Sequence, residues 1–283
     1  MPRIGILHPG QMGSMVALSL QNGGNEVCWA SEGRSAATRS RAVELNLTDV
    51  DSLAELCGTC AVIVSVCPPE FADEIADRAL EHPFRGLYID ANAISPLRAR
   101  RMAERMGSLG IRFVDGGIVG PAARAPGRTW IYLSGENAAE AAQCFANPLQ
   151  TKVIGGGAGQ ASAFKMCYAG YNKGTMALLC AVLASAEHWG VRRLLEDQWA
   201  THTSELAPRD AEKIAARAAP RAWRFAPEMR EIADTFEAAG APPEFHRAAA
   251  EIFSKLSGFK DAADPDLEEI VRALAPLAAG EGK

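Results

Sequence analysis

A short glycine-containing segment, HPGQMG at residues 8–13, directly follows an apolar run at residues 4–7. An apolar strand that leads through such a turn into a helix is typical of a site for the phosphates of a dinucleotide. Gly10 has no Cβ to keep backbone amides away from an anion, and Gly13 lets the new helix pack closely on the strand. The residues therefore predict a pyrophosphate site.

The segment departs from the usual G-x-G-x-x-G pattern because His8 replaces the first glycine. Pro9 and Gly10 favour a type II turn, so we expect the tight turn one residue later than usual. A helix over residues 11–22 would direct its first amides and the positive end of its dipole toward the phosphates. The predicted cofactor contacts of this segment are His8, Gly10, Gln11, Met12 and Gly13. Two interpretations of His8 stay open: a turn residue packed under the loop, or a polar group that reaches the phosphates.

Residues after the second predicted strand distinguish NADP from NAD. Ser31, Arg34 and Ser35 offer a cation and hydroxyl donors to a 2′-phosphate, whereas Glu32 can instead accept from a ribose diol. We favour NADP over NAD as the cofactor. The alternative is that Arg34 is a solvated residue at the start of a helix.

Small-residue loops follow the later strands. The carboxyl ends of parallel strands line the ligand crevice, so we expect the backbone of Val66, Cys67 and Pro68 to lie against the adenosine part of the cofactor. Loops that begin at Asp90 and Asp115 would meet at the same edge of the sheet. These two acids either serve the site or simply brace the loops.

One lysine stands in an otherwise apolar helical segment. Lys165 lies one to two turns into this helix, where an unpaired ammonium would be costly. Asn172 shares its face at helical spacing, so both side chains can project into a cleft between two domains. The lysine either extends its ammonium to water or acts in catalysis.

Composition excludes several kinds of partner. The chain has 283 residues and a net charge of −5, which offers no general attraction for nucleic acid or an anionic membrane. The seven cysteines are scattered, and the pair at Cys57 and Cys60 lacks a second pair or a histidine at zinc spacing. We therefore expect no metal, and a reducing, cytoplasmic location without a signal peptide or a membrane span.

Strand and helix patterns alternate up to about residue 150, which indicates βαβ units. The predicted fold class is α/β: an N-terminal doubly wound Rossmann-type parallel sheet over residues 1–155, followed by an all-α C-terminal domain over residues 156–283. Strands are expected at residues 4–7, 27–30, 61–66, 87–90, 111–115 and 130–133. Helices are expected in the second domain at residues 160–189, 193–205, 208–218, 227–239, 243–256 and 266–277. The first of these is apolar on all sides and needs neighbouring helices or a second subunit to cover it, so we expect a homodimer.

Three segments resemble, in order, motifs of the β-hydroxyacid dehydrogenase superfamily, which includes 3-hydroxyisobutyrate and 6-phosphogluconate dehydrogenases. They are HPGQMG at residues 8–13, DANAISP at residues 90–96 and GQASAFKM at residues 159–166. The tail, with WRFAPEMREI at residues 223–232 and FHRAAAE at residues 245–251, looks like a less characterised branch with its own helical C-terminal domain. The resemblance covers nearly the whole chain.

The resemblance implies that Lys165 is the general acid or base on the substrate oxygen while a hydride moves to or from the nicotinamide. Such a role requires a lysine that releases its proton near working pH, and desolvation in a closed cleft lowers a lysine pKa in that direction. The loop at residues 90–96 is implied to hold substrate and nicotinamide, with Asn92 and Ala93 where the family has Ser and Thr. An amide can still orient a carboxylate or hydroxyl there.

Two further departures concern the substrate. The second substrate loop usually ends in Ser-Gly-Gly, whereas this chain has Val119-Gly120-Pro121, so Gly120 remains as a substrate contact without a neighbouring hydroxyl. The family's helical Asn is Ala169 here, and Asn172, one turn later on the same face, is expected to stand in for it.

The function predicted from these features is an NAD(P)-dependent oxidoreductase that interconverts a small β-hydroxy acid and its oxo acid. Arg221, Arg224 and His246 either bind the anionic substrate or form surface salt links. Two alternatives stay open. One is imine-reductase-like reduction of a C=N bond, against which Lys165 argues because those enzymes often carry Asp or Tyr there. The other is a non-catalytic NADP-binding dimer, which the altered substrate loops favour.

Overall fold

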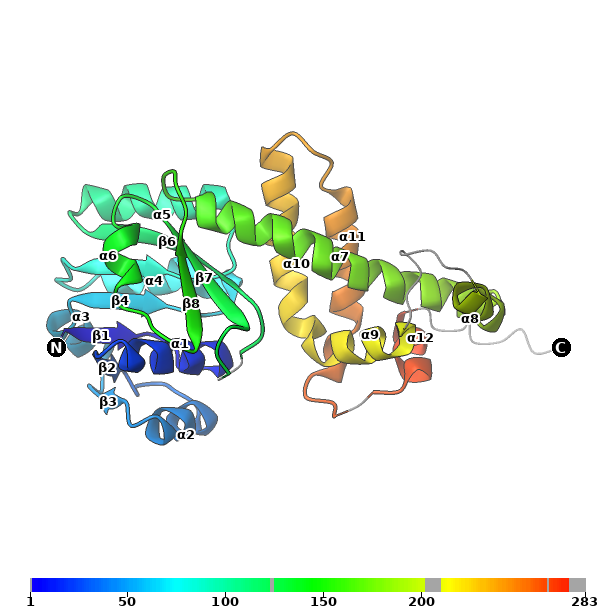
Figure 1. The fold of residues 1–283 in the computed structure, drawn as a ribbon, viewed down its shortest axis with the longest axis horizontal. Coiled ribbons are helices and arrows are strands. Elements are labelled where there is room, and N and C mark those ends of the chain that lie inside the picture. Colours follow the sequence, from blue (N-terminus) through cyan, green and yellow to red (C-terminus); the bar gives the residue numbers. More distant parts are fainter. Residues whose placement is uncertain (1, 123–124, 202–209, 264, 275–283) are drawn as a thin grey trace. The chain divides into compact units, whose positions relative to one another are not determined.

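The computed structural model describes residues 2–122, 125–201, 210–263 and 265–274. Contacts divide the chain into two compact units, Met1–Cys167 and Tyr168–Lys283. Figure 1 colours the first unit from blue to green and the second from green to red. No helix in the described part of the chain is long and apolar enough to cross a membrane.

The first unit is built on one eight-stranded sheet with the order β3-β2-β1-β4-β5-β6-β7-β8. Neighbouring strands from β3 to β6 are parallel, β7 is antiparallel to β6, and β8 is parallel to β7. The strand order reverses between β1 and β4, which is where a doubly wound sheet binds its ligand. The strands are β1 Arg3–Ile6, β2 Glu26–Trp29, β3 Thr48–Asp49, β4 Val62–Ser65, β5 Leu87–Asp90, β6 Arg112–Val119, β7 Thr129–Ser134 and β8 Leu149–Val153.

Helices cover both faces of this sheet. Residues of α1, α2 and α6 join one buried apolar cluster, and residues of α3, α4 and α5 join another on the opposite face. Ile4 and Ile6 of β1 point to the same face and belong to the first cluster, and Leu7, directly after the strand, belongs to the second. The helices are α1 Gln11–Asn22, α2 Ala36–Glu44, α3 Leu53–Thr59, η1 Pro69–Phe71, α4 Ala72–Leu80, α5 Pro96–Ser108 and α6 Ala138–Ala142. The predicted Rossmann-type α/β fold followed by a helical region is confirmed.

All six predicted strands are present, and the sequence missed two. Strand β3 has only two residues, and β8 is a half-exposed edge strand with the polar sequence LQTKV. A strand needs several buried apolar residues to stand out in a sequence, and neither segment has them. Strand β6 runs four residues further than expected, to Val119, because it continues as the partner of β7.

The second unit is helical in its described residues. Helix α7 (Gln160–His188) runs on from the first unit, and α10 and α11 pack against each other. Gly170 and Gly174 of α7 permit close contact, since a Cβ at Gly170 would lie 3.2 Å from Ile232 and one at Gly174 would lie 2.8 Å from Phe245. The remaining helices are α8 Arg192–Thr201, α9 Ala211–Ala218, η2 Ala219–Arg221, α10 Ala222–Ala238, α11 Glu244–Lys255, η3 Ser257–Phe259 and α12 Leu267–Leu274.

The predicted helix start at residue 227 is wrong. Helix α10 begins at Ala222, and Pro227 lies inside it. A proline in a helix removes one backbone hydrogen bond, but Phe225 and Met229 are buried on either side of it and keep the helix packed. The predicted helix ends at residues 205 and 277, and the predicted start at residue 208, lie outside the described residues.

Helix α7 keeps large apolar side chains on its surface. The exposed fractions are 73% for Tyr171, 50% for Leu178 and 76% for Trp189, which follows the helix. The expectation that helices of this chain bury α7 on all sides therefore does not hold for the described residues. A second subunit is the other cover that the sequence predicts for this helix.

Candidate functional site

The turn after β1 is tighter than the sequence predicted. Gly10 has a φ of −72° and a ψ of −164°, and its N–H donates to the carbonyl of His8 at 2.8 Å. A type II turn needs a positive φ at this glycine, so that prediction is wrong. The chain instead turns over three residues, which His8 and Pro9 can adopt without a glycine.

The start of α1 fits a pyrophosphate. No side chain caps the helix, and Ser14 turns its hydroxyl back to the carbonyl of Gly10 at 2.6 Å. The first helical amides, from Gln11 to Gly13, therefore have no side-chain acceptor and are suited to an anion. A Cβ on Gly10 would meet nothing within 4 Å, whereas one on Gly13 would lie 1.9 Å from the carbonyl oxygen of His8. Gly10 leaves room for a ligand, and Gly13 brings the helix against the turn.

His8 is a neutral, half-buried ring. Burial first, and then the positive charges of Arg34 and Arg78, lower the pKa of His8 to about 4. Its Nδ1 is buried without a hydrogen-bond partner in the described structure. At neutral pH the ring carries no charge to offer a phosphate, which favours the interpretation of His8 as a packed turn residue.

The loop after β2 is held by an arginine that the sequence reasoning missed. The guanidinium of Arg39 donates to the carbonyl of Ser31 at 2.6 Å and to that of Arg34 at 3.3 Å. Ser35 caps α2 by accepting from the amide of Thr38 at 3.3 Å. Arg39 lies one helical turn beyond the loop, and this spacing was the only signal in the sequence that could have indicated its role.

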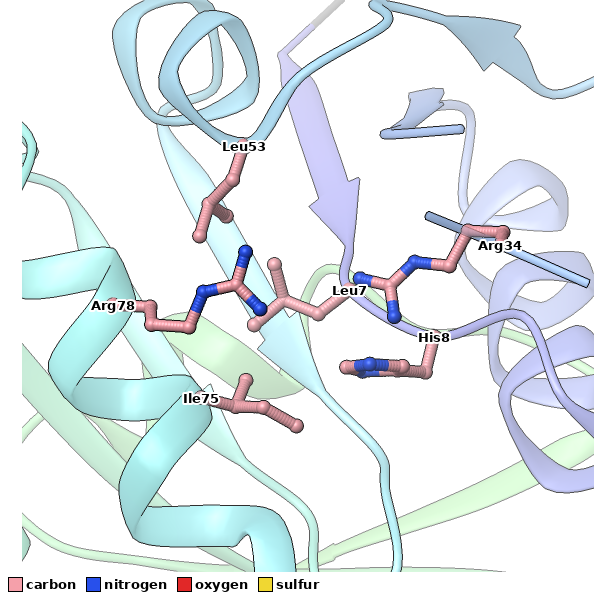
Figure 2. A pocket seen from close by; sticks show the side chains of 6 residues that line it. All are labelled: Leu7, His8, Arg34, Leu53, Ile75 and Arg78. Atoms are coloured by element: carbon pink, nitrogen blue, oxygen red, sulfur yellow. The ribbon is translucent and has the colours of Figure 1, made fainter. Parts of the chain in front are cut away.

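Arg34 points into a pocket at the end of β1. Figure 2 shows it with His8, and with Arg78 extending from α4 on the opposite side. The apolar lining comes from Leu7, Leu53 and Ile75. Burial lowers the pKa of Arg34, and the charge of Arg78 lowers it further. Sequence reasoning named His8 and Arg34 but missed Arg78, because nothing in its neighbourhood shows which side of α4 it occupies.

Asn92 joins the loops after β4 and β5. Its Oδ1 accepts from the amide of Cys67 at 2.6 Å, and its Nδ2 donates to Asp90 at 2.7 Å and to Ser65 at 3.1 Å. The residue is 2% exposed, and both N–H bonds of its amide are used. Asn92 therefore holds the loop on which Val66, Cys67 and Pro68 lie, and a substrate contact through its amide stays a prediction. Ala93 is the next residue along, and it is half-buried.

Asp90 braces this junction. Its carboxylate accepts from the backbone amide of Asn92 at 3.1 Å as well as from the side-chain amide. Burial nevertheless raises the pKa of Asp90 to about 7, and the hydrogen bonds from Asn92 only partly oppose that effect. The bracing interpretation of this acid is confirmed by its contacts.

Asp115 anchors the start of α7. This fully buried carboxylate on β6 accepts from the amides of Gly159 and Ser162, at 2.9 and 3.0 Å, and from the hydroxyl of Ser162 at 2.6 Å. Ser134 of β7 donates to Asp115 at 3.0 Å and accepts from the amide of Ala161 at 3.0 Å. Asp115 and Ser134 together satisfy the first amides of α7 and complement the positive end of its dipole.

Lys165 lies one turn beyond this anchor. A Cβ on Gly117 of β6 would come 2.7 Å from the carbonyl oxygen of Ala161 and 3.0 Å from the Cβ of Lys165. Helix α7 therefore crosses directly over Gly117, and only a glycine leaves the space. Lys165 is half-buried there. Gly120, with a φ of +124°, lies three residues after Gly117 and directly follows β6.

Asn172 belongs to the second unit. It is exposed, and its Nδ2 donates to the carbonyl of Tyr168 on its own helix at 2.8 Å. Ala169, which replaces the family's helical Asn, is buried. The first unit thus brings the predicted cofactor residues to one edge of the sheet and places Lys165 in the same unit, whereas Asn172 lies in the other.

His246 is a core residue rather than an anion ligand. It is 5% exposed, and its ring packs edge-on against Phe236 and Phe245. Burial lowers its pKa, so the ring stays neutral among apolar neighbours. The expectation that it binds a substrate anion or forms a surface salt link is corrected. Arg224 is half-buried with its guanidinium 5.7 Å from the ring of Phe225.

Cys57 and Cys60 are free, buried thiols. Burial raises the pKa of Cys57 to about 11 and that of Cys60 to about 12. Both stay protonated at neutral pH and pack as small apolar residues, without the thiolate that redox chemistry or zinc binding requires.

Comparison with known proteins agrees with this geometry. Residues 3–151 match the family model of the NAD binding domain of 6-phosphogluconate dehydrogenase, and residues 186–256 match a domain of unknown function. A conserved protein described as structurally similar to 3-hydroxyacid dehydrogenases is 30% identical, with 91% of this chain and 97% of that chain covered and a TM-score of 0.65. No protein of curated function matches the sequence.

Two more distant structures share the fold. The 3-hydroxyisobutyrate dehydrogenase of Mycobacterium tuberculosis is 22% identical, with 97% of this chain and 99% of that chain covered and a TM-score of 0.70. An imine reductase of Streptomyces aurantiacus is 16% identical, with 95% of this chain and 98% of that chain covered and a TM-score of 0.54.

The sheet, its phosphate cradle and the matched domain define a dinucleotide-binding protein of the Rossmann class. The chain belongs to the β-hydroxyacid dehydrogenase superfamily, in which an NAD binding domain of the 6-phosphogluconate dehydrogenase type is followed by a helical domain. The resemblance inferred from the sequence is confirmed.

The two cradle glycines are expected to respond differently to alanine. Gly10→Ala should leave the free energy of unfolding within about 0.5 kcal/mol of wild type, because its φ suits alanine and its Cβ meets nothing, yet weaken NADPH or NADH at least about tenfold. Gly13→Ala should cost about 2 kcal/mol or more of stability because of the clash with His8. Urea denaturation and fluorescence titration measure the two effects. Equal stability losses in both variants would contradict this division of roles.

A His8→Gln variant tests the buried ring. The pKa of His8 is lowered to about 4, so the unfolded chain binds a proton more readily, and this contribution to stability is present above pH 6.5 and lost as the pH falls toward 4. Between those values the difference in unfolding free energy between wild type and His8→Gln should change by about 2 kcal/mol. Asp90 titrates in both proteins, so its contribution cancels in the difference between their unfolding free energies. A constant difference across that range would show that His8 is not desolvated.

Proposed function

We propose that the protein is an NADP-preferring oxidoreductase that interconverts a small, anionic β-hydroxy acid and its oxo acid, with Lys165 as general acid and base. The observation that carries the proposal is the anchoring of α7 by Asp115, which holds Lys165 over Gly117 in the same unit as the phosphate cradle. We assign residues 1–155 to the cofactor and residues 156–283 to the substrate and dimerisation.

A bound nicotinamide would supply or accept the hydride. Lys165 donates a proton to the substrate oxygen during reduction and removes it during oxidation, because a carbonyl that receives a hydride must also receive a proton. The hydrogen bonds at the start of α7 fix the backbone from which Lys165 extends. A fixed backbone limits the positions that the ammonium can take, which favours a role in proton transfer. Ala93 and Gly120 offer backbone contacts to the substrate, and Asn172 is proposed as a contact from the helical unit.

The cofactor site is proposed along the edge from β2 to β5. In this proposal the backbone amides of Gly10 to Gly13 bind the pyrophosphate of the cofactor. The loop from Ser31 to Ser35 binds the adenosine ribose and its 2′-phosphate, and Val66 to Pro68 lie against the adenosine. Arg34 supports NADP because a guanidinium binds a phosphate with two hydrogen bonds. Asn92 contributes by holding the backbone amide of Cys67 in place.

Reduction of a C=N bond is the second candidate. The fold likeness to an imine reductase favours it, as do Asn92 and Ala93 in place of the family's Ser and Thr. Lys165 favours the hydroxy-acid reaction, since those reductases often carry Asp or Tyr at that position. The non-catalytic alternative predicts NADPH binding without turnover on either class of compound.

A Lys165→Ala variant is expected to lower kcat at least about a hundredfold while the Kd for NADPH stays within about twofold of wild type, since general acid catalysis supplies such factors. Turnover is followed by NADPH absorbance on panels of oxo acids and of cyclic imines. Lys152→Ala, which removes an exposed lysine from β8 of the same unit, is the matched control. Near-normal turnover by the Lys165→Ala variant would refute the proposed role. If the wild-type protein turns over imines in preference to oxo acids, the proposed substrate class changes from hydroxy acids to imines.

We further propose a homodimer in a reducing, cytoplasmic compartment. Tyr168, Tyr171 and Leu178 are exposed at spacings of three and seven residues on α7, which places them on one face of the helix. A second copy of the chain is the proposed cover for this face. All seven cysteines are free thiols, as expected of a chain that stays in a reducing environment.

Sedimentation is expected to give the mass of two chains for wild type. A Tyr171→Glu, Leu178→Glu double variant should shift the protein to the mass of one chain, because two carboxylates would be buried unpaired in each half of the interface. Leu97→Glu makes the same change at an exposed leucine of α5 and should leave the mass unchanged. A wild-type monomer, or a double variant that remains dimeric, would contradict this surface.

A further inference from the structure

Two arginines from separate elements converge on one pocket. Arg34 enters from the loop after β2 and Arg78 from α4, and Figure 2 shows their guanidinium groups extending toward one another across Leu7 and His8. Arg78 is exposed and Arg34 is half-buried. Like charges in such positions repel, and the pKa of Arg34 is lowered by burial and then by Arg78.

Nearby carboxylates do not neutralise this pair. Two acids of α4 pair with arginines of α5 instead: Asp77 with Arg105 at 2.8 Å, and Asp73 with Arg98 at 2.6 Å. Glu74, one helical turn before Arg78, is exposed and forms no ion pair with it in the described structure. Within the described structure no ion pair joins Arg34 or Arg78 to an acid, and the Nε of Arg34 is buried without a hydrogen-bond partner. The third group of the pocket, His8, is neutral and adds no negative charge.

The charge of the pocket selects a kind of anion. A phosphate monoester carries about −1.5 to −2 at neutral pH and presents three oxygens, whereas each phosphate of a pyrophosphate diester carries about −1. Two guanidinium groups match the monoester. The pyrophosphate is proposed to bind instead at the first amides of α1, which no side chain caps. The pocket also lies beside the loop after β2, where the adenosine ribose of a dinucleotide is bound in this fold.

We propose that Arg78 is a second determinant of cofactor specificity, which binds the 2′-phosphate of NADP(H) from α4 while Arg34 binds it from the loop after β2. The inference rests on the proposed function, because it requires that the sheet edge binds a nicotinamide dinucleotide. Leu7, Leu53 and Ile75 line the same pocket beside the half-buried Arg34 and reduce the contact of its guanidinium with water, which strengthens its interaction with an anion. Arg39 holds the backbone of Arg34 so that one side of the clamp is fixed.

Fluorescence titrations of the full chain with NADPH and NADH test this role. Arg78→Met should weaken NADPH about tenfold and leave NADH within about twofold, since a charge-assisted hydrogen bond to the 2′-phosphate is lost. Arg34→Met is the reference variant, because it is also expected to weaken NADPH and not NADH. Arg101→Met removes an exposed arginine from α5 and is the matched control for net charge. Thermal melts check that all variants are folded.

A second measurement separates phosphate binding from packing. Competition by 2′,5′-ADP and by 5′-AMP should show that Arg78→Met loses affinity for the first compound only. The NADPH affinity of Arg78→Met should also fall less steeply with salt than that of wild type, because one fewer cation contacts the phosphate. Arg78→Lys, which keeps the charge, should recover part of the NADPH affinity.

The outcomes distinguish this inference from the function on which it rests. If Arg34→Met weakens NADPH selectively and Arg78→Met does not, Arg78 is not a determinant, and the proposed oxidoreductase stands. If Arg78→Met weakens NADPH and NADH equally, Arg78 packs against the adenosine and the inference is overturned. If wild type binds neither dinucleotide, both proposals fall together.

Discussion

The contact between the buried carboxylate of Asp115 and the first amides of α7 determines where the first turns of this helix lie. A fully buried carboxylate is tolerated only when hydrogen-bond donors surround it, and here Gly159, Ser162 and Ser134 supply them. The same donors are the amides that a helix start leaves unpaired. The carboxylate and the helix amides therefore offset each other's cost of burial. The same hydrogen bonds fix the start of α7 to β6. Lys165 takes its position from that attachment.

Sequence patterns were informative where burial is strong and local. The parallel strands β1, β2, β4, β5 and β6 are covered on both faces, so they appear as short apolar runs, and these five predictions were confirmed, as was that of the antiparallel strand β7. The edge strands β3 and β8 lack such runs and were missed. The turn at Gly10 was predicted from residue preferences alone, but a tighter turn wins because it brings α1 against the carbonyl of His8.

The candidate site was predictable only in part, for a related reason. Gly10 and Gly13 are only three residues apart, at the N-cap and in the first turn of α1. Their predicted roles depend on local backbone structure, so the sequence pattern shows them directly. Arg78 shares its pocket with Arg34, and Asn92 accepts from the amide of Cys67, and in both cases the two residues are far apart in the sequence. Such contacts depend on which side of an element faces inward, which the sequence does not show. Sequence alone suggested a ligand contact for Asn92 because it could not show that Cys67 and Asp90 use its amide. His246 was misjudged for the same reason.

The hydrogen bonds of Asn92 couple the movements of the loops after β4 and β5. Its amide is bonded to the backbone of Cys67 on one side and to Asp90 on the other, within a space that admits almost no water. Neither loop can move far without breaking a buried bond or carrying its neighbour along. A ligand that holds the loop of Cys67 in place therefore also restricts the loop that contains Asn92 and Ala93.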